Sequence, residues 1–204
     1  MLVRLAIMPS FTYAYRGGII ENRHHLSIAI VNSENKLVAS AGNPNLLAHL
    51  RSSAKPFQAQ ALFLSGAAKK FGFTDKELAL TCASHFGSAE HVAVARGILD
   101  KISLGVFDLA CGVHMPSDKE ERARLERAHE KPSALHNNCS DKHSGMLAVA
   151  RALGAATQGY EKPEHPVQQL NFQTVRDLSG SEDIPYGIDG CSVPAFVLTL
   201  QNAA

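Results

Sequence analysis

The pattern of apolar and polar positions changes near residue 50. Before it, GIIENRHHLSIAIV (18–31) is rich in β-branched residues, which favours strands. KLVASAG (36–42) follows the turn-forming run Asn32-Ser33-Glu34-Asn35, so the two segments are predicted to form a hairpin. The loop-forming residues Asn43-Pro44-Asn45 then end a unit that is mostly β-strand.

Helical patterns follow from Arg51 onward. Pro56 fits only the first turn of a helix, so a helix is predicted from close to Ser52 to about Gly66. Capping-box spacing at Thr74-Asp75-Lys76-Glu77 and at Ser117-Asp118-Lys119-Glu120 predicts the starts of two more helices.

Three further segments have helical character. Val92, Ala95 and Leu99 keep a helical period after Ser88. Residues 140–153, which are followed by the helix-ending Gly154, and residues 166–178 are also predicted helices. Strands followed by helices indicate an α/β fold or an α+β sandwich. We expect a single domain over 1–204, with strands mostly in 1–50 and helices mostly in 51–204.

The last apolar segment is Ala195-Phe196-Val197-Leu198-Thr199-Leu200, close to Ala204. Such a segment normally packs against following structure, so we interpret the end as a truncation; the alternative is a short terminal helix docked on the same core.

Composition narrows the function classes. The chain is 45% hydrophobic and 19% charged with a net charge of +1, which disfavours nucleic acid and membrane surfaces as partners. Four cysteines in 204 residues do not form a disulfide-dense scaffold. The chain has no apolar run of bilayer length, and its N-terminus is too short and too weakly apolar for a secretory signal. A cytoplasmic location is the simplest expectation.

Ser52 and Lys55 have the S-x-x-K spacing, which brings the two side chains onto one face of a helix. A partly desolvated lysine can remove the hydroxyl proton of such a serine. The same spacing occurs in penicillin-binding proteins and serine β-lactamases. It also occurs by chance in many proteins, so a helix cap and a solvated lysine are the alternative.

Three other clusters combine polar and reactive side chains. CASHFG (82–87) places Ser84 and His85 in a loop after a helix, and a capping serine is the simpler reading. HNNCSDKHSGML (136–147) precedes an apolar helix, whose N-terminus favours anions. Cys139 and Lys142 do not have a usual zinc spacing, and a buried cysteine is favoured by spacing alone. The glycines of GIDGC (187–191) would let the backbone approach a ligand.

In order along the chain, the sequence contains RSSAKPFQ, CASHFG, ACGVHMP, NNCSDKHSGML, EHPVQ and GIDGCSVP. Together these blocks resemble the Rhizobium-type (thermolabile, type II family) L-asparaginases, from about Tyr15 to the end of the chain. The resemblance implies a fold related to serine β-lactamases and glutaminases, incomplete at its C-terminus, and a homodimer. It implies hydrolysis of a small amide, L-asparagine, to L-aspartate and ammonia.

The resemblance also assigns roles to individual residues. The catalytic set falls on Ser52, Lys55 and Ser84. A zinc site of two cysteines and a lysine falls on Cys139, Lys142 and Cys191; the lysine must be deprotonated to bind the metal. The positions around the substrate are Arg51, His143 and Asp189, where an arginine suits the α-carboxylate and an aspartate the α-ammonium.

The chain departs from the family pattern in three places. Asp141 stands where the family has glycine, next to the expected zinc lysine, and Ser88 stands where the family usually has glutamate. The lysine that serves the family's second serine lies in a C-terminal third that this sequence does not contain. A truncated, catalytically inactive remnant that still binds zinc is therefore the alternative to an active amidohydrolase. A third hypothesis, a protein that reacts with penicillin, is supported by the S-x-x-K spacing alone.

Overall fold

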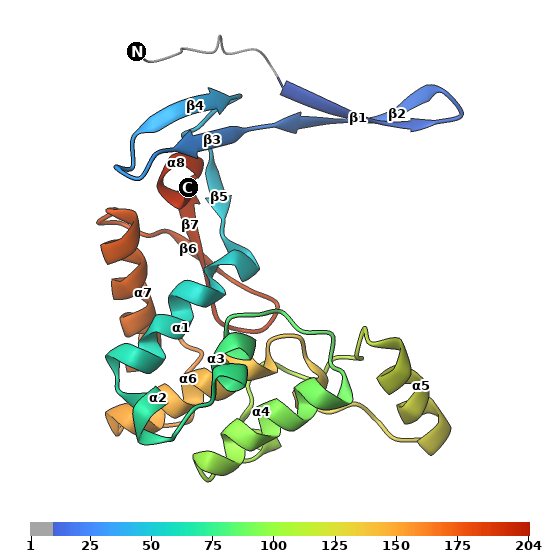
Figure 1. Ribbon diagram of the computed structural model, residues 1–204, viewed down its shortest axis with the longest axis vertical. Helices are drawn as coiled ribbons and strands as arrows, with labels where there is room; N and C mark the ends of the chain where they lie inside the picture. Colours follow the sequence, from blue (N-terminus) through green and yellow to red (C-terminus); the bar gives the residue numbers. More distant parts are fainter. Residues whose placement is uncertain (1–9) are drawn as a thin grey trace.

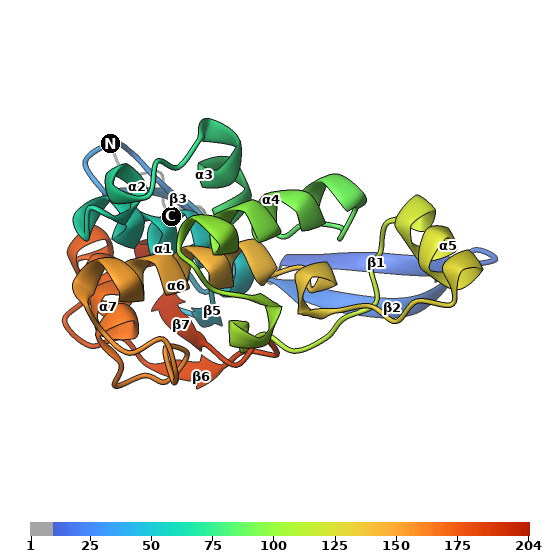
Figure 2. The same cartoon turned by 90° about the horizontal axis from the view of Figure 1, so that it is seen from below.

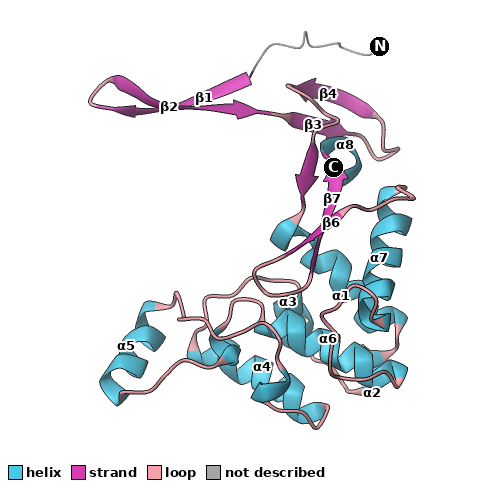
Figure 3. Cartoon of the chain, turned by 180° about the vertical axis from the view of Figure 1, so that it is seen from behind, coloured by secondary structure: helices cyan, strands magenta, loops and turns pink. Residues whose placement is uncertain are grey.

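A helical region carries three small antiparallel sheets at one end in the computed structural model, which describes residues 10–204 (Figure 1). Figure 3 shows α1 to α7 gathered at one end and the strands, with the short helix α8, at the other. This mixture of helices and strands agrees with the predicted α/β class. No helix in the described part of the chain has the length and apolarity needed to cross a bilayer.

Within residues 10–204, seven strands form the three sheets, in the orders β1-β2, β3-β4 and β5-β7-β6. They are β1 (Ser10–Arg16), β2 (Ile19–Leu26), β3 (Ile28–Val31), β4 (Leu37–Ala41), β5 (Leu47–His49), β6 (Tyr186–Ile188) and β7 (Pro194–Thr199).

The predicted hairpin is confirmed for β3 and β4, which pair antiparallel across the turn at Asn32. The segment 18–31 is not one strand, however, because it divides at Ser27. β2 pairs with β1 instead, and the resulting two-stranded ribbon extends away from the rest of the molecule (Figures 1 and 2).

The eight α-helices and three 3-10 helices lie between Arg51 and Ala203. The α-helices are α1 (Lys55–Leu64), α2 (Ala67–Lys70), α3 (Asp75–Thr81), α4 (Ala89–Lys101), α5 (Lys119–Ala128), α6 (Ser140–Leu153), α7 (Pro166–Ser179) and α8 (Leu200–Ala203). The 3-10 helices are η1 (Arg51–Ala54), η2 (Val106–Asp108) and η3 (Ala134–His136).

Most predicted helix boundaries are confirmed. α3 opens on the predicted capping box between Thr74 and Glu77, and α6 ends at Gly154, whose φ is +68°. The predicted capping serine of α5 is wrong: the side chain of Asp118, one residue later, accepts the N–H of Glu121 at 2.8 Å. A carboxylate caps at least as well as a hydroxyl and also suits the positive end of the helix.

α6 is the central helix, and it packs against α1, α2, α3, α4 and α7 (Figure 2). Every residue from Ser140 to Ala150 is buried, so this helix has no solvent-facing side over three turns. A Cβ on Gly145 would lie 3.1 Å from the side chain of Thr81, so the glycine permits close contact with the end of α3. The polar residues at the start of α6 are therefore held rigidly within the core.

The apolar segment 195–200 mostly belongs to β7, the middle strand of the sheet β5-β7-β6, and the short helix α8 follows it. Phe196 and Leu198 pack in a second apolar cluster with Phe172 and Val175 of α7. This packing fixes the loop between β6 and β7 beside the N-terminus of α6.

Candidate functional site

The side chain of Lys55 is the centre of a buried polar cluster. Lys55 is 1% exposed, and its Nζ lies 2.7 Å from Ser84 Oγ, 2.7 Å from the carbonyl oxygen of Ala83 and 3.2 Å from that of Asn138. The loop after α3 and the turn before α6 thus converge on the first residue of α1. Three acceptors surround one amine, so its position is well defined.

Ser84 lies between Lys55 and Ser52. Its hydroxyl donates to Ser52 Oγ at 3.0 Å while its oxygen accepts from Lys55. The spacing predicted that Ser52 and Lys55 meet directly, whereas the hydroxyl that Lys55 contacts is that of Ser84. Ser52 lies in the 3-10 helix η1, and the amine of Lys55 turns toward Ser84 and the carbonyl oxygens of Ala83 and Asn138 instead.

Burial is the main reason why the pKa of Lys55 lies below its ordinary value, because it disfavours the charged ammonium. The positive charge of Lys142 lowers the pKa further, while the thiols of Cys139 and Cys191 raise it. The net downward direction increases the fraction of neutral amine, which is the form that can accept a proton.

Arg51 and Asp189 form an ion pair next to Ser52, with 2.9 Å between Arg51 Nη2 and Asp189 Oδ1. Arg51 has a φ of +48°, an uncommon backbone conformation for a non-glycine residue. Both side chains and Ser52 line a cavity of about 230 Å³. The other lining residues are His114, Asn137, Asn138, Cys139, Gly190 and Cys191.

Cys139 and Cys191 line this cavity and interact with each other, while Lys142 lies behind it; each of the three residues is at most 7% exposed. Lys142 Nζ lies 3.2 Å from Cys191 Sγ. Interaction with the Cys139 thiol lowers the pKa of Cys191, and burial opposes this. The pKa of Cys139 is raised by the same interaction and by burial. Cys191 is therefore the thiol that ionises more readily.

His143 lies deeper than the other predicted residues. It is fully buried, its Nδ1 is 2.7 Å from the hydroxyl of Tyr160, and it is not among the residues that line the cavity. Its Nε2 has no hydrogen bond of acceptable geometry within residues 10–204, although it is close enough to Cys191 to lower the pKa of that thiol. The role of His143 at the substrate stays a prediction.

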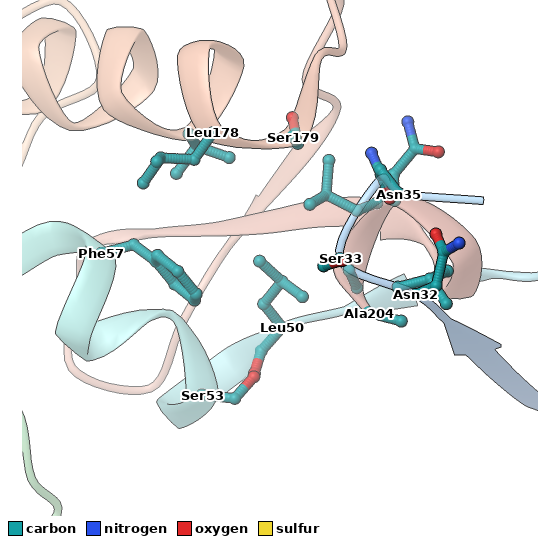
Figure 4. A pocket seen from close by; sticks show the side chains of 14 residues that line it. Asn32, Ser33, Asn35, Leu50, Ser53, Phe57, Leu178, Ser179 and Ala204 are labelled. Atoms are coloured by element: carbon teal, nitrogen blue, oxygen red, sulfur yellow. The ribbon is translucent and has the colours of Figure 1, made fainter. Parts of the chain in front are cut away.

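A second cavity, of about 400 Å³, lies elsewhere, among α1, α7, α8 and the turn after β3 (Figure 4). Its side chains are apolar or uncharged polar, with Leu50, Phe57 and Leu178 on one side and Asn32 and Ser33 on the other. None of its lining side chains ionises near neutral pH, so none of them can act as the general base that would activate its serine hydroxyls.

One family model, described as L-asparaginase II, matches residues 12–204. The chain belongs to the L-asparaginase II family. The match includes every residue of the polar cluster and of the small cavity described above. Comparison with curated proteins finds no match. The L-asparaginase II family consists of asparaginase-like amidohydrolases, which act on small amide substrates.

The donor set of Cys139, Lys142 and Cys191 fits a zinc ion. Thiolate sulfur and neutral nitrogen are ligands that zinc prefers, and the three side chains already meet in a buried place. Within residues 10–204 no three His, Cys, Asp or Glu side chains converge as a metal site, so the Lys142 amine is needed as the third donor. The carboxylate of Asp141 does not join them, because it contacts His85 and Ser140 instead.

The cavity is also lined by residues of the family-like blocks to which the sequence assigned no role. His114 belongs to the ACGVHMP block, and Asn137 and Asn138 belong to the block before α6. The amide of Asn137 donates to the carbonyl oxygens of Cys111 and Gly112 at 2.8 and 3.2 Å. It thereby attaches the loop with His114 to the start of α6. In the sequence, only the two adjacent asparagines before Cys139 point to this contact between the two loops.

Proposed function

We propose that this member of the L-asparaginase II family hydrolyses the side-chain amide of L-asparagine through an acyl-enzyme on Ser52. The observation that carries the proposal is the continuous contact from Ser52 through Ser84 to the buried amine of Lys55, at 3.0 and 2.7 Å. Ser52 is the proposed nucleophile because it lines the small cavity and is adjacent to Arg51.

The ion pair of Arg51 and Asp189 suits the head group of an amino acid. The guanidinium would bind the α-carboxylate and the carboxylate would bind the α-ammonium, so the substrate exchanges one ion pair for two. Since Arg51 precedes Ser52, this placement brings the side-chain amide of the substrate near the Ser52 hydroxyl.

Proton transfer through Ser84 accounts for the activation of Ser52. A neutral Lys55 donates its two N–H groups to the carbonyls of Ala83 and Asn138 and accepts the Ser84 proton with its lone pair. With Lys55 neutral, both hydroxyls rotate so that the two hydrogen bonds reverse direction, and Ser84 accepts the Ser52 proton as Ser52 Oγ attacks the amide carbon. The protonated Lys55 remains satisfied, because Ser84 Oγ then accepts its third N–H.

The same groups complete the reaction. The Lys55 ammonium returns a proton through Ser84 to the departing nitrogen, which leaves as ammonia, and the substrate remains as an ester on Ser52. Water then attacks the ester, with its proton taken by the same path, and L-aspartate is released. A fold like that of serine β-lactamases would suit this chemistry, which also proceeds through an acyl-enzyme.

Zinc is proposed as a resident ion on Cys139, Lys142 and Cys191. When bound there, it would join the start of α6 to the loop between β6 and β7. Since that loop also contains Asp189, these residues would hold the substrate-binding carboxylate in position.

The test is ammonia release from L-asparagine, with zinc supplied, by the unmodified chain and three serine variants. Ser52→Ala and Ser84→Ala are expected to lose turnover, whereas Ser53→Ala is the matched control, since the Ser53 hydroxyl only caps the carbonyl of Leu50. An unmodified chain that releases no ammonia at neutral or mildly alkaline pH would contradict the proposal and favour an inactive remnant.

A further inference from the structure

The loop with Ser84 has no regular secondary structure of its own. Residues 82–88 connect α3 to α4, and Ser84 itself is exposed. A hydroxyl in such a loop would ordinarily sample many positions, yet Ser84 Oγ must stay within hydrogen-bond distance of both Lys55 and Ser52. The next residue, His85, supplies the restraint.

His85 and Asp141 form a fully buried pair, with 0% exposure of both side chains and 3.0 Å between His85 Nε2 and Asp141 Oδ2. The Nδ1 of His85 accepts the N–H of Gly87 at 3.0 Å, so the ring proton lies on Nε2. That proton points to Asp141 Oδ2 and to Ser140 Oγ, which is 2.9 Å away. The hydroxyl of Ser140 donates to the carbonyl of Leu135 and therefore accepts from His85.

The same residue is also held through its backbone. The N–H of His85 donates to the carbonyl oxygen of Asn138 at 3.3 Å, and this oxygen also accepts from Lys55 Nζ. The ring and the backbone of His85 thus attach the Ser84 loop to the rigid first turn of α6. Gly87, two residues further along the loop, packs closely as well, since a Cβ there would be 2.8 Å from the carbonyl oxygen of His136.

Asp141 is not explained by packing alone. Its Oδ1 has no hydrogen-bond partner within the described residues, and a buried carboxylate with an unsatisfied oxygen costs stability. Its other oxygen, Oδ2, contacts Ser140 at 3.5 Å and, at 3.0 Å, His85, the residue next to Ser84.

We propose that His85 and Asp141 are positioning residues: their hydrogen bond holds the Ser84 loop so that Ser84 stays between Ser52 and Lys55 during proton transfer. This inference rests on the proposed function. It assigns neither residue any contact with substrate, and it requires the acceptor on Asp141 and the Nε2 donor on His85.

The test compares variants that keep the hydrogen bond with variants that remove it. Asp141→Asn keeps an acceptor oxygen, and His85→Gln keeps a donor near the position of Nε2. Asp141→Ala removes the acceptor, and His85→Asn mimics only the Nδ1 side of the ring and cannot reach Asp141. Asp177→Ala and Asp177→Asn, on the exposed face of α7, are the matched controls for the two aspartate changes.

Asparagine turnover is measured per folded molecule, with folding checked by circular dichroism. Asp141→Ala and His85→Asn are expected to lower kcat by about tenfold to a hundredfold with KM nearly unchanged, because a displaced Ser84 impairs proton transfer and not binding. Asp141→Asn and His85→Gln are expected to recover most of kcat, and combining Asp141→Ala with His85→Asn should add little to either loss.

A kcat close to that of the unmodified chain in folded Asp141→Ala would overturn the inference and leave the proposed function intact. A raised KM with normal kcat would also overturn it. If the variants that remove the bond do not fold, the test uses NMR spectra of the unmodified chain. The His85 Nε2–H is expected there as a hydrogen-bonded ring proton. Its absence would refute the hydrogen bond between His85 and Asp141. An unmodified chain without turnover removes both proposals together.

Discussion

Replacement of Lys55 by methionine separates the proposed catalytic role of this residue from its structural one. Methionine matches the length and apolar character of the lysine stem, so α1 should keep its packing against α6 and α7. The substitution removes the amine that contacts Ser84, Ala83 and Asn138. The Asn138 carbonyl still accepts the N–H of His85, so the main loss is at Ala83.

These contacts set the expected magnitudes. A carbonyl left without its donor costs about 1–3 kcal/mol of folding stability, which the burial of an apolar side chain in place of an amine partly offsets. Loss of the general base costs about 10²–10⁴-fold in kcat, equivalent to about 3–5 kcal/mol of transition-state stabilisation. Folding should therefore change little while turnover nearly disappears.

The assay combines ammonia release with a thermal unfolding curve recorded on the same sample. Lys119→Met, at the exposed start of α5, is the control for loss of a lysine charge and should leave both unchanged. Turnover of folded Lys55→Met within a few-fold of the unmodified chain would refute the role of Lys55 as the base.

Three further predictions concern Glu77, Asp189 and Cys191. Burial raises the pKa of Glu77, but hydrogen bonds from Lys101 and Thr74 outweigh this effect, so the pKa lies below its ordinary value. Glu77→Gln should therefore lower the free energy of unfolding at neutral pH by about 1–2 kcal/mol, measured by chemical denaturation. This difference should shrink as the pH falls through the lowered pKa. Asp189→Asn should raise KM for L-asparagine by about tenfold or more, because the α-ammonium loses its charged partner. Cys191→Ser should reduce the zinc content measured by elemental mass spectrometry of purified protein, because serine oxygen is a poor substitute for thiolate.

Each of these has a distinct contrary result. A stability difference between the unmodified chain and Glu77→Gln that is constant from neutral to acidic pH would show that the carboxylate charge contributes nothing. A rise in KM as large for Asp183→Asn, a matched change outside the cavity, would remove the assignment of Asp189. Equal zinc content in Cys191→Ser and in Cys82→Ser would exclude the proposed metal site.

The sequence predicts local structure well where local chemistry sets it. The capping box at Thr74 and the glycine after α6 define helix ends through interactions within a few residues. The helical segment 140–153 was correctly predicted for this reason. The division of the segment 18–31 into two strands was not predicted, because it depends on which partner each half pairs with across the sheet.

The site required information from distant parts of the chain. Lys55 and Ser84 are 29 residues apart, and Lys142 and Cys191 are 49 residues apart, so spacing alone could not bring them together. The family resemblance named these residues. The position of Ser84 between Ser52 and Lys55 became apparent only from the three-dimensional arrangement, because Ser84 comes from a loop 32 residues after Ser52 and 29 residues after Lys55.

The central claim is that Ser52 is the nucleophile and carries the acyl group. The most direct test is to treat the chain with a diazoketone analogue of L-asparagine, which alkylates a nucleophile held at the position of the substrate amide, and to map the modified residue by peptide mass spectrometry. We predict a single modification on Ser52 that excess L-asparagine prevents and that is lost in Ser52→Ala. Modification of Ser84 in place of Ser52, or equal labelling of the Ser52→Ala variant, would contradict the claim.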